Sequence, residues 1–190
     1  MNDWDNDINK SIEVLEQGGV ILFPTDTIWG LGCDATDPVA VEKILRIKQR
    51  SSSQGFIVLL DDETRIAEYV TNPDSRIFDY LKTTLKPTTV IYEDGKNVAY
   101  NILPGNGSLA IRLVKDAFCN KLIAHFGKPI VSTSANLHGS PSPSIFREVD
   151  IKIKDAVDFI VRYGQQETTA KEASAVVKWL AEGKVEIIRP

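Results

Sequence analysis

The stretch 21–35, ILFPTDTIWGLGCDA, passes from an apolar strand into a polar turn and then stays apolar. A turn that only reverses the chain uses Gly, Asn, Asp or Pro, each for a backbone reason. The cluster Thr25, Asp26, Thr27 and the nearby Trp29 exceed what a reversal needs. The stretch is therefore typical of a strand end built to face a ligand.

Strands and helices alternate along the rest of the chain. Ile8, Ile12 and Leu15 recur at helical spacing, and Asp37 before Pro38 is typical of the start of a second helix, which we expect to reach residue 49. Further strands are expected at 20–23, 55–60, 88–93, 108–114, 128–136, 157–163, 173–179 and 184–190, and further helices at 63–70, 73–82, 116–126 and near 146. This order predicts an α/β fold with a mixed sheet, in a single domain over 1–190.

The composition excludes several classes of protein. With 190 residues and a net charge of −4, the chain can bury a core and has no bulk electrostatic reason to bind nucleic acid. Two distant cysteines and two histidines predict neither a disulfide framework nor a metal site. The polar, acidic start and the absence of a long apolar run argue against a signal peptide or membrane span, so we expect a cytoplasmic protein.

Two cations lie at the end of the second expected helix. Lys48 and Arg50 flank Gln49 directly before SSSQG, residues 51–55. Lys48 continues the apolar stripe of that helix, so one interpretation is a side chain that only extends to the surface. The other is an anion site, in which both cations and the following hydroxyls bind phosphate or carboxylate groups.

Two more polar features follow later strands. The segment STSAN, residues 132–136, offers three hydroxyls and an amide, either for a turn at the strand end or for a ligand. Alternation in SLAIRLV places Ser108, Ala110 and Arg112 on one face of a strand. Arg112 is then either an exposed edge charge or a clamp for a carboxylate. Because ligands bind where strand ends gather such loops, the clusters together favour a ligand site.

These motifs, GGVILFPTDTIWGLGCDA, then K-x-R at Lys48 and Arg50, then S-x-N at Ser134 and Asn136, resemble the YrdC/TsaC family over nearly the whole chain, in its short form. The resemblance implies a twisted, open and mostly parallel β-sheet flanked by helices, with a concave substrate cavity. It also implies L-threonylcarbamoyladenylate synthase activity. Such a nucleotidyltransferase joins L-threonine, bicarbonate or CO2 and ATP, releases pyrophosphate, and serves the t6A modification of tRNA.

The resemblance also implies roles for individual residues. By motif position the catalytic cations would be Lys48 and Arg50. The threonine site would comprise Thr27, Arg112, Ser132 and Ser174, and the ATP site would comprise Arg50, Gln54, Ser108, Ser134, Asn136, Ser142 and Arg189. Mg²⁺ would accompany the triphosphate without dedicated protein ligands.

The chain departs from the commoner family pattern at a few positions. Ser51 replaces a proline after K-x-R, Leu59 replaces a histidine of many two-domain relatives, and the segment 85–90 lacks the usual Trp-Pro-Gly-Pro pattern. These changes concern the details of nucleotide contact. Downstream partners would be the proteins that transfer the product to tRNA, with direct tRNA binding weak or absent. The alternatives are an RNA-binding module, or a related carbamoylating or adenylating enzyme on the same fold.

Overall fold

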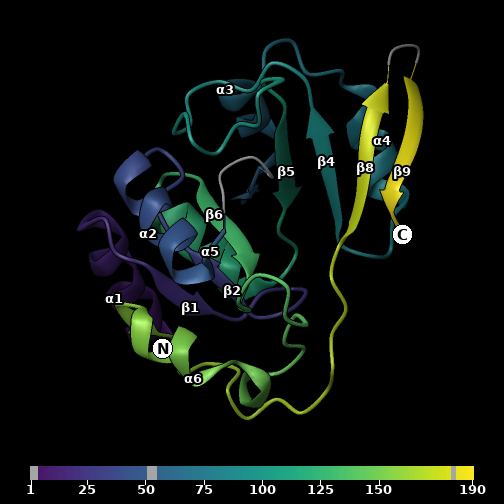
Figure 1. Ribbon diagram of the computed structural model, residues 1–190. Helices are drawn as coiled ribbons and strands as arrows, with labels where there is room; N and C mark the ends of the chain where they lie inside the picture. Colours follow the sequence, from purple (N-terminus) through teal and green to yellow (C-terminus); the bar gives the residue numbers. More distant parts are fainter. Residues whose placement is uncertain (1–3, 51–54, 181–182) are drawn as a thin grey trace.

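A nine-stranded sheet organises the part of the chain that the structure, a computed structural model, describes: residues 4–50, 55–180 and 183–190 (Figure 1). Along the sheet the strands follow the order β7-β1-β2-β6-β3-β5-β4-β8-β9. Their bounds are β1 Ile21–Phe23, β2 Gly30–Gly32, β3 Ile57–Leu60, β4 Thr88–Tyr92, β5 Leu109–Leu113, β6 Ile130–Ser134, β7 Phe159–Ile160, β8 Ala175–Leu180 and β9 Lys184–Arg189.

The sheet is mixed, as the residue pattern predicts. Parallel pairing joins β1 to β7, β3 to β5 and β4 to β8, whereas the other five neighbouring pairs are antiparallel. The expectation of a mostly parallel sheet is therefore wrong. The cause is that β2 and β6 run opposite to both of their neighbours, and that β4 with β5 and β8 with β9 also pair antiparallel, so that antiparallel pairs are interspersed along the whole sheet.

Helices pack on both faces of the sheet. They are α1 Asp5–Glu16, α2 Pro38–Lys48, η2 Glu63–Arg65, α3 Ile66–Tyr69, α4 Arg76–Thr83, α5 Ala117–Phe126, η3 Phe146–Glu148 and α6 Ile151–Ala156. One face packs on α2, α3, α4 and α6, in a core that contains Ile44, Ile66, Ile77 and Ile153. The opposite face packs on α1 and α5 through residues such as Leu15 and Phe118.

The second face is covered over only part of the sheet. Its core cluster draws on β1, β3 and β6 and on none of the described residues of β4 or β8. Arg112 of β5 is in register with Thr89 of β4 and with Leu59 of β3, so these side chains point to that same face. Beyond α5 the sheet therefore presents an uncovered surface, and this is where the site forms.

The second helix follows the sequence signals closely. The Asp37 side chain accepts a hydrogen bond from the Val39 amide, and Pro38 occupies the first helical position. Gln49 ends the helix in the left-handed conformation, with φ of 52°. This ending turns the chain sharply, so that Lys48 and Arg50 point in different directions.

Two elements differ from the expectation. Strand β2, with the sequence Gly-Leu-Gly, is not predicted by its composition, because glycine disfavours strands. The strand expected at 157–163 is only the two-residue β7, and the helix α6 precedes it. The remaining expected elements are present with small changes at their ends.

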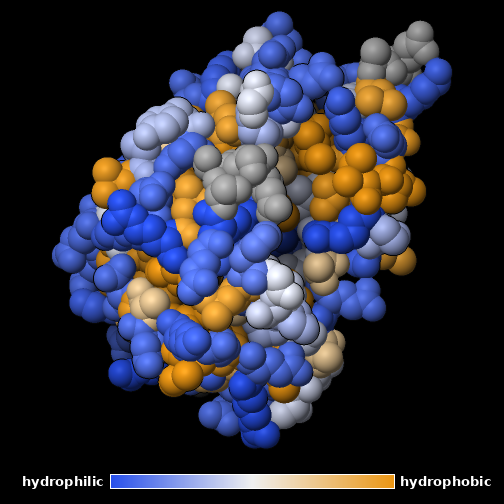
Figure 2. Space-filling model, viewed as in Figure 1, coloured by the Kyte–Doolittle hydropathy of each residue, from blue (hydrophilic) through white to orange (hydrophobic). Residues whose placement is uncertain are grey.

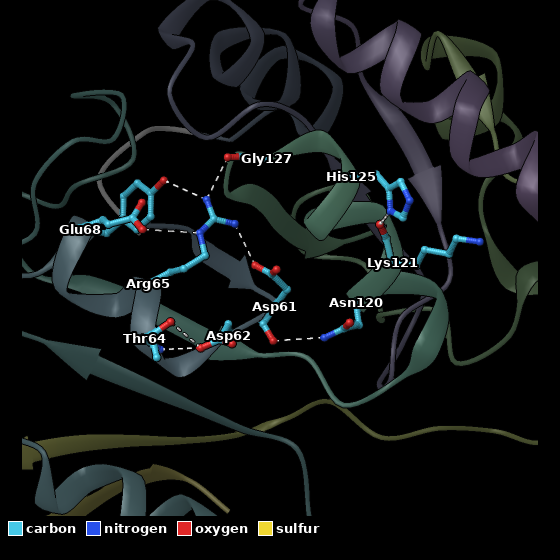
Figure 3. Close-up of polar contacts among 10 residues, drawn as sticks. Asp61, Asp62, Thr64, Arg65, Glu68, Asn120, Lys121, His125 and Gly127 are labelled. Atoms are coloured by element: carbon cyan, nitrogen blue, oxygen red, sulfur yellow. Dashed lines mark hydrogen bonds and ion pairs between the residues drawn. The ribbon is translucent and has the colours of Figure 1, made fainter.

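A cluster around Arg65 ties the segment after β3 to the end of α5 (Figure 3). Its guanidinium pairs with Asp61 at 2.8 Å and donates to the Gly127 carbonyl at 2.9 Å. The Asn120 side-chain amide donates to the Asp61 carbonyl at 3.1 Å. These contacts tie α5 to the segment that follows β3.

Strand β9 forms one edge of the sheet. Its side chains Ile187 and Ile188 are 66% and 53% exposed, and Figure 2 shows apolar side chains gathered over β8 and β9. Among the helices that the structure describes, none is long and apolar enough to cross a membrane.

Candidate active site

A cavity of about 480 Å³ opens on the uncovered face of the sheet. Its volume is within the range of small-molecule and cofactor sites. Nine residues that the sequence analysis assigns to substrate binding line it, namely Thr27, Arg50, Ser108, Arg112, Ser132, Ser134, Ser142, Ser174 and Arg189. They come from loops and strands distributed over most of the chain.

The charge of this cavity is one-sided. Its described lining contains three guanidinium groups, from Arg50, Arg112 and Arg189, and no carboxylate. Seven hydroxyl side chains complete the polar part of the lining. In a chain with a net charge of −4, such a concentration of cations defines a local anion site.

The opening turn is built by its own hydroxyls. The Thr25 Oγ1 accepts from the Thr27 amide at 3.0 Å and donates to the Ile28 carbonyl at 2.8 Å. The two threonine hydroxyls also lie 2.9 Å apart. Because the hydrogen of Thr25 goes to Ile28, Thr27 is the donor between them. The Thr27 oxygen therefore offers lone pairs to the cavity, which suits a ligand hydroxyl or amine.

Arg112 lies in an internal strand and is almost completely buried. Strand β5 runs between β3 and β4, so the interpretation as an exposed edge charge is wrong. The Arg112 Nη2 lies 3.1 Å from Oδ1 of Asp26, and the two side chains are only 4% and 7% exposed. Arg112 faces the cavity with Ser108 and Ala110 beside it, as alternation along the strand predicts.

Ser174 and Arg189 support one another across the last two strands. The Arg189 Nε donates to the Ser174 carbonyl at 2.9 Å, and Nη2 lies 3.3 Å from the Ser174 hydroxyl. That hydroxyl also shares a hydrogen bond of 2.9 Å with Thr89. The pKa of Arg189 is lowered, first by burial and then by the charge of Arg112. The two guanidinium groups therefore share one part of the cavity.

Arg50 leaves the second helix toward the cavity. Its Nη2 donates to the Gly55 carbonyl at 2.6 Å, and its guanidinium lies 5.0 Å from the centre of the Phe56 ring. Burial lowers the pKa of Arg50. The neighbouring predicted residues Ser51 and Gln54 lie outside the described residues.

The structure places Lys48 and Asn136 behind the lining rather than in it. Lys48 is 3% exposed, and its Nζ donates to the carbonyls of Ser134 and Asn136 at 2.5 and 2.8 Å. It also lies 3.3 Å from the Asn136 side-chain oxygen. Lys48 therefore binds the S-x-N loop from the protein interior, and its ammonium group does not reach the surface.

The S-x-N loop is cross-linked within itself. The Ser134 hydroxyl and the Asn136 side-chain amide oxygen are 2.5 Å apart, and the amide nitrogen donates to the Ser140 carbonyl. Opposite the loop, Gly30 of β2 pairs with Ser134, and a Cβ on Gly30 would lie 3.1 Å from the Ser132 hydroxyl. The absence of a side chain on Gly30 keeps room for Ser132.

Two departures from the family pattern lie apart from the cavity lining. Leu59 is fully buried in the cluster with α5, next to Arg112 in register. In the segment 85–90, Leu85 is fully exposed, while Thr89 is buried and contacts Ser174. This segment thus supports the site through Thr89.

Several residues that line the cavity or support its lining are not predicted from the sequence. Thr133 and Phe56 line the cavity, although alternation in the strand gives no signal for Thr133. Thr89 hydrogen-bonds with Ser174, and Asp26 pairs with Arg112. Asp26 is present in the quoted turn, but its partner is far away in the chain.

Comparisons with known proteins agree with this geometry. The Sua5/YciO/YrdC family model, described as "Telomere recombination", matches residues 13–190. Threonylcarbamoyl-AMP synthase of Coxiella burnetii is 36% identical over 74% of this chain and 76% of its own length. That of Pseudoalteromonas translucida is 32% identical over 81% of this chain and 84% of its own length.

Solved structures share the fold. E. coli YciO superposes with a TM-score of 0.83 at 27% identity, over 99% of this chain and 90% of that one. A P. abyssi Sua5 variant has a TM-score of 0.88 at 25% identity, and this chain spans 57% of its length. The open mixed sheet is thus that of a known α/β class, and the chain belongs to the Sua5/YciO/YrdC family.

Proposed function

We propose that the chain is an L-threonylcarbamoyladenylate synthase. It would form threonylcarbamoyl-AMP and pyrophosphate from L-threonine, bicarbonate or CO2, and ATP, for the t6A modification of tRNA. The observation that carries the proposal is the cavity with three guanidinium groups, seven hydroxyls and no carboxylate among its described lining residues. Relatives named threonylcarbamoyl-AMP synthase, which match most of the chain, support it.

The threonine end of the cavity would be formed by Thr27, Arg112, Ser132 and Ser174. The guanidinium of Arg112 suits the α-carboxylate of the amino acid, because its fork matches two carboxylate oxygens. The acceptor lone pairs of Thr27 suit the amino acid's hydroxyl or amine. A pocket that hydrogen-bonds a hydroxyl rejects analogues that lack it. A P. abyssi Sua5 structure complexed with L-threonine has the same fold.

The ATP end would be formed by the remaining lining residues. Arg50 and Arg189 would offset phosphate charge, and Ser108, Ser134 and Ser142 would donate hydrogen bonds. Asn136 would act from behind by holding the Ser134 hydroxyl. Gln54 belongs to this proposal through the family motif alone.

The reaction requires mainly that the substrates are positioned and that the charge on the phosphates is neutralised. The threonine amine and CO2 would give a carbamate, whose oxygen attacks the α-phosphorus of ATP while the bond to pyrophosphate breaks. Negative charge gathers on the phosphate oxygens in such a transfer, and fixed cations stabilise it. Arg50 is the lining cation placed for this role. Lys48 would contribute by fixing the S-x-N loop.

A metal ion would enter with the nucleotide. The described residues contain no cluster of carboxylates, histidines or cysteines that could hold one, and the described cavity lining offers cations and hydroxyls. Such a lining fits the oxygens of a triphosphate rather than a metal. Mg²⁺ bound by the triphosphate would supply further charge neutralisation.

The proposed setting follows from the reaction. The product would pass to the t6A transferase proteins, with weak or no direct tRNA binding by this chain. We place the enzyme in the cytoplasm, where its nucleotide and amino-acid substrates are available.

Pyrophosphate release provides the test. The protein is mixed with ATP and bicarbonate, and each amino acid is added in turn. We expect release that requires ATP, bicarbonate and L-threonine together, and little release with serine or valine. Equal rates with serine, valine and no amino acid would exclude the proposal.

The same assay separates the alternatives. A related enzyme on this fold would release pyrophosphate with a different amino acid or with a different carbamoyl acceptor. An RNA-binding module would release none, and would bind RNA with a steep dependence on salt.

A further inference from the structure

The carboxylate of Asp26 is placed against the proposed substrate clamp without any role in the reaction. Its Oδ1 lies 3.1 Å from the Arg112 Nη2, and both side chains are almost completely buried. Neither oxygen of Asp26 meets hydrogen-bond geometry with a described residue. The Lys115 backbone amide, the Asp116 carboxylate and the Lys171 ammonium also influence the charge state of Asp26.

Other buried carboxylates of this chain are held differently. The Asp7 Oδ2 accepts from the backbone amides of Arg162 and Tyr163, at 2.9 and 2.8 Å. The Asp34 Oδ1 accepts from the Thr36 amide and hydroxyl, while its Oδ2 pairs with Lys128. Such hydrogen bonds make these groups structural. Asp26 interacts with its surroundings chiefly through charge.

The charge of Asp26 matters because the cavity is crowded with cations. Burial first, and then repulsion from the charge of Arg112, lower the pKa of Arg189. A buried guanidinium without a counter-ion is unfavourable. Asp26 therefore neutralises Arg112 while no ligand is bound. When a carboxylate ligand arrives, the two carboxylates have to share one guanidinium.

We propose that Asp26 is a positioning residue that acts through Arg112 as a competing counter-ion. It keeps the empty cavity stable and weakens the hold of Arg112 on carboxylate ligands. In the proposed reaction the product keeps the carboxylate of the amino acid, so the competition also favours product release. The inference rests on the proposed function, since it takes the amino acid as the ligand of Arg112.

The variant Asp26→Asn tests the competition, because it keeps the shape and removes the charge. The readouts are the dissociation constant for L-threonine by calorimetry, the KM for ATP and kcat. We expect threonine to bind about tenfold more tightly, the effect of removing one nearby like charge. The KM for ATP should stay within about twofold, and kcat should fall as product release slows. Unchanged or weaker threonine binding would overturn the proposal.

The matched control is Asp34→Asn, which breaks the ion pair of another buried carboxylate away from the cavity. Asp34 and Lys128 lie 2.7 Å apart, and the Asp34 side chain is 5% exposed. This variant should lose stability and keep the threonine dissociation constant. If both variants changed threonine binding equally, the effect on Asp26 would be a general loss of stability.

A measurement on the unmodified protein decides the matter if Asp26→Asn does not fold. Burial raises the pKa of Asp26 above its ordinary value, against the opposing charge of Arg112. Protonated Asp26 no longer competes, so the threonine dissociation constant should fall as the pH falls from 7.5 to 4. The same trend should persist in Asp116→Asn, which keeps a side-chain oxygen to cap α5. A constant affinity over this range would contradict the proposal.

Different results would contradict the proposed function and the proposed role of Asp26. If the unmodified protein binds no L-threonine, the proposed function fails. If it binds L-threonine and releases pyrophosphate, but Asp26→Asn changes neither affinity nor turnover, only the role of Asp26 is wrong.

Discussion

The arginines of the cavity differ in what holds them, and so in what each would lose on substitution. Arg50 stands on a turn, with a hydrogen bond to the Gly55 carbonyl and the Phe56 ring beside it. Arg112 stands in an internal strand with a buried counter-ion. Arg189 is anchored on Ser174. A turn residue can change with little effect on the fold, whereas a strand residue cannot.

For Arg50→Ala we expect a loss of at least about a hundredfold in kcat/KM, because a fixed cation at a phosphate stabilises the transition state. The free energy of unfolding should fall by only about 1 kcal/mol, the worth of one hydrogen bond. Arg46→Ala is the control, since Arg46 lies on the helix that precedes Arg50 and pairs with Glu42 on the surface. Wild-type turnover in Arg50→Ala would contradict the anion site.

For Arg112→Lys we expect the threonine KM to rise by about tenfold or more, since charged hydrogen bonds contribute about 1.5–3 kcal/mol. Lysine keeps the charge and cannot reproduce the planar fork. The KM for ATP should move much less. Steady-state kinetics with each substrate varied separately would measure both values, and an unchanged threonine KM would refute the clamp.

Lys48 should produce two opposite trends with pH. Burial first, and then the charge of Arg50, lower the pKa of Lys48 from 10.5 to about 8. Above pH 8 the amine loses a donor to the S-x-N loop, so turnover should decline. Between pH 8 and 10.5 the unfolded chain holds the extra proton, so the contribution of Lys48 to the free energy of unfolding rises with pH.

The comparison variant for these trends is Lys48→Met. It leaves the Ser134 and Asn136 carbonyls without their donor, which should lower the free energy of unfolding by about 2–3 kcal/mol. Its residual activity should show no decline near pH 8. Rate profiles and urea unfolding at pH 7.5 and 9.5 would measure both effects. A wild-type profile that stays flat above pH 8 would argue against a charged Lys48 beneath the loop.

At the scale of elements, strand β2 links the opening turn to the S-x-N strand. It pairs with β1 on one side and with β6 on the other. A Cβ on Gly32 would lie 2.7 Å from the Phe23 ring and 3.1 Å from the Val131 carbonyl. The strand therefore fits between its neighbours because it has no side chain at this position.

For Gly32→Ala we expect a loss of about 2 kcal/mol or more in the free energy of unfolding, typical of overpacking in a rigid core. Gly105→Ala is the matched control, because a Cβ there would meet no atom within 4 Å. Thermal unfolding of both variants would measure the difference. Equal stability of the two would mean that the core adapts around β2.

The elements show what the sequence can predict. The cap at Asp37 and Pro38 and the alternation in β5 are local signals, and both are confirmed. Strand β2 has no local signal, since its two glycines are selected by neighbours from other parts of the chain. The ion pair between Asp26 and Arg112 also has no local sequence signal, because it depends on the strand register and on the position of the loop that carries Asp26. Local chemistry thus predicts which residues are candidates, and tertiary contacts decide how they act.

At the scale of the whole molecule, the coverage of the sheet decides where the cavity lies. Helices α1 and α5 cover one part of a face, and the described residues of β4 and β8 contribute nothing to their core. The same face then carries the cavity, whose lining includes Arg112 and Ser174. The family match over residues 13–190 agrees with a sheet that acts as one unit.

The pairing of β4 with β8 also has a consequence for how the chain folds. This parallel pair joins Thr89 to Val176, so it cannot form before the distant segment that contains Val176 is available. Pairings between distant segments form late, because closing a long loop loses chain entropy before any contact compensates. Ser174 and Arg189 reach the cavity only with this step. During synthesis, the earlier helices and strands could pack together before the last strands have left the ribosome. Such a partly synthesised chain would still be unable to bind its substrates.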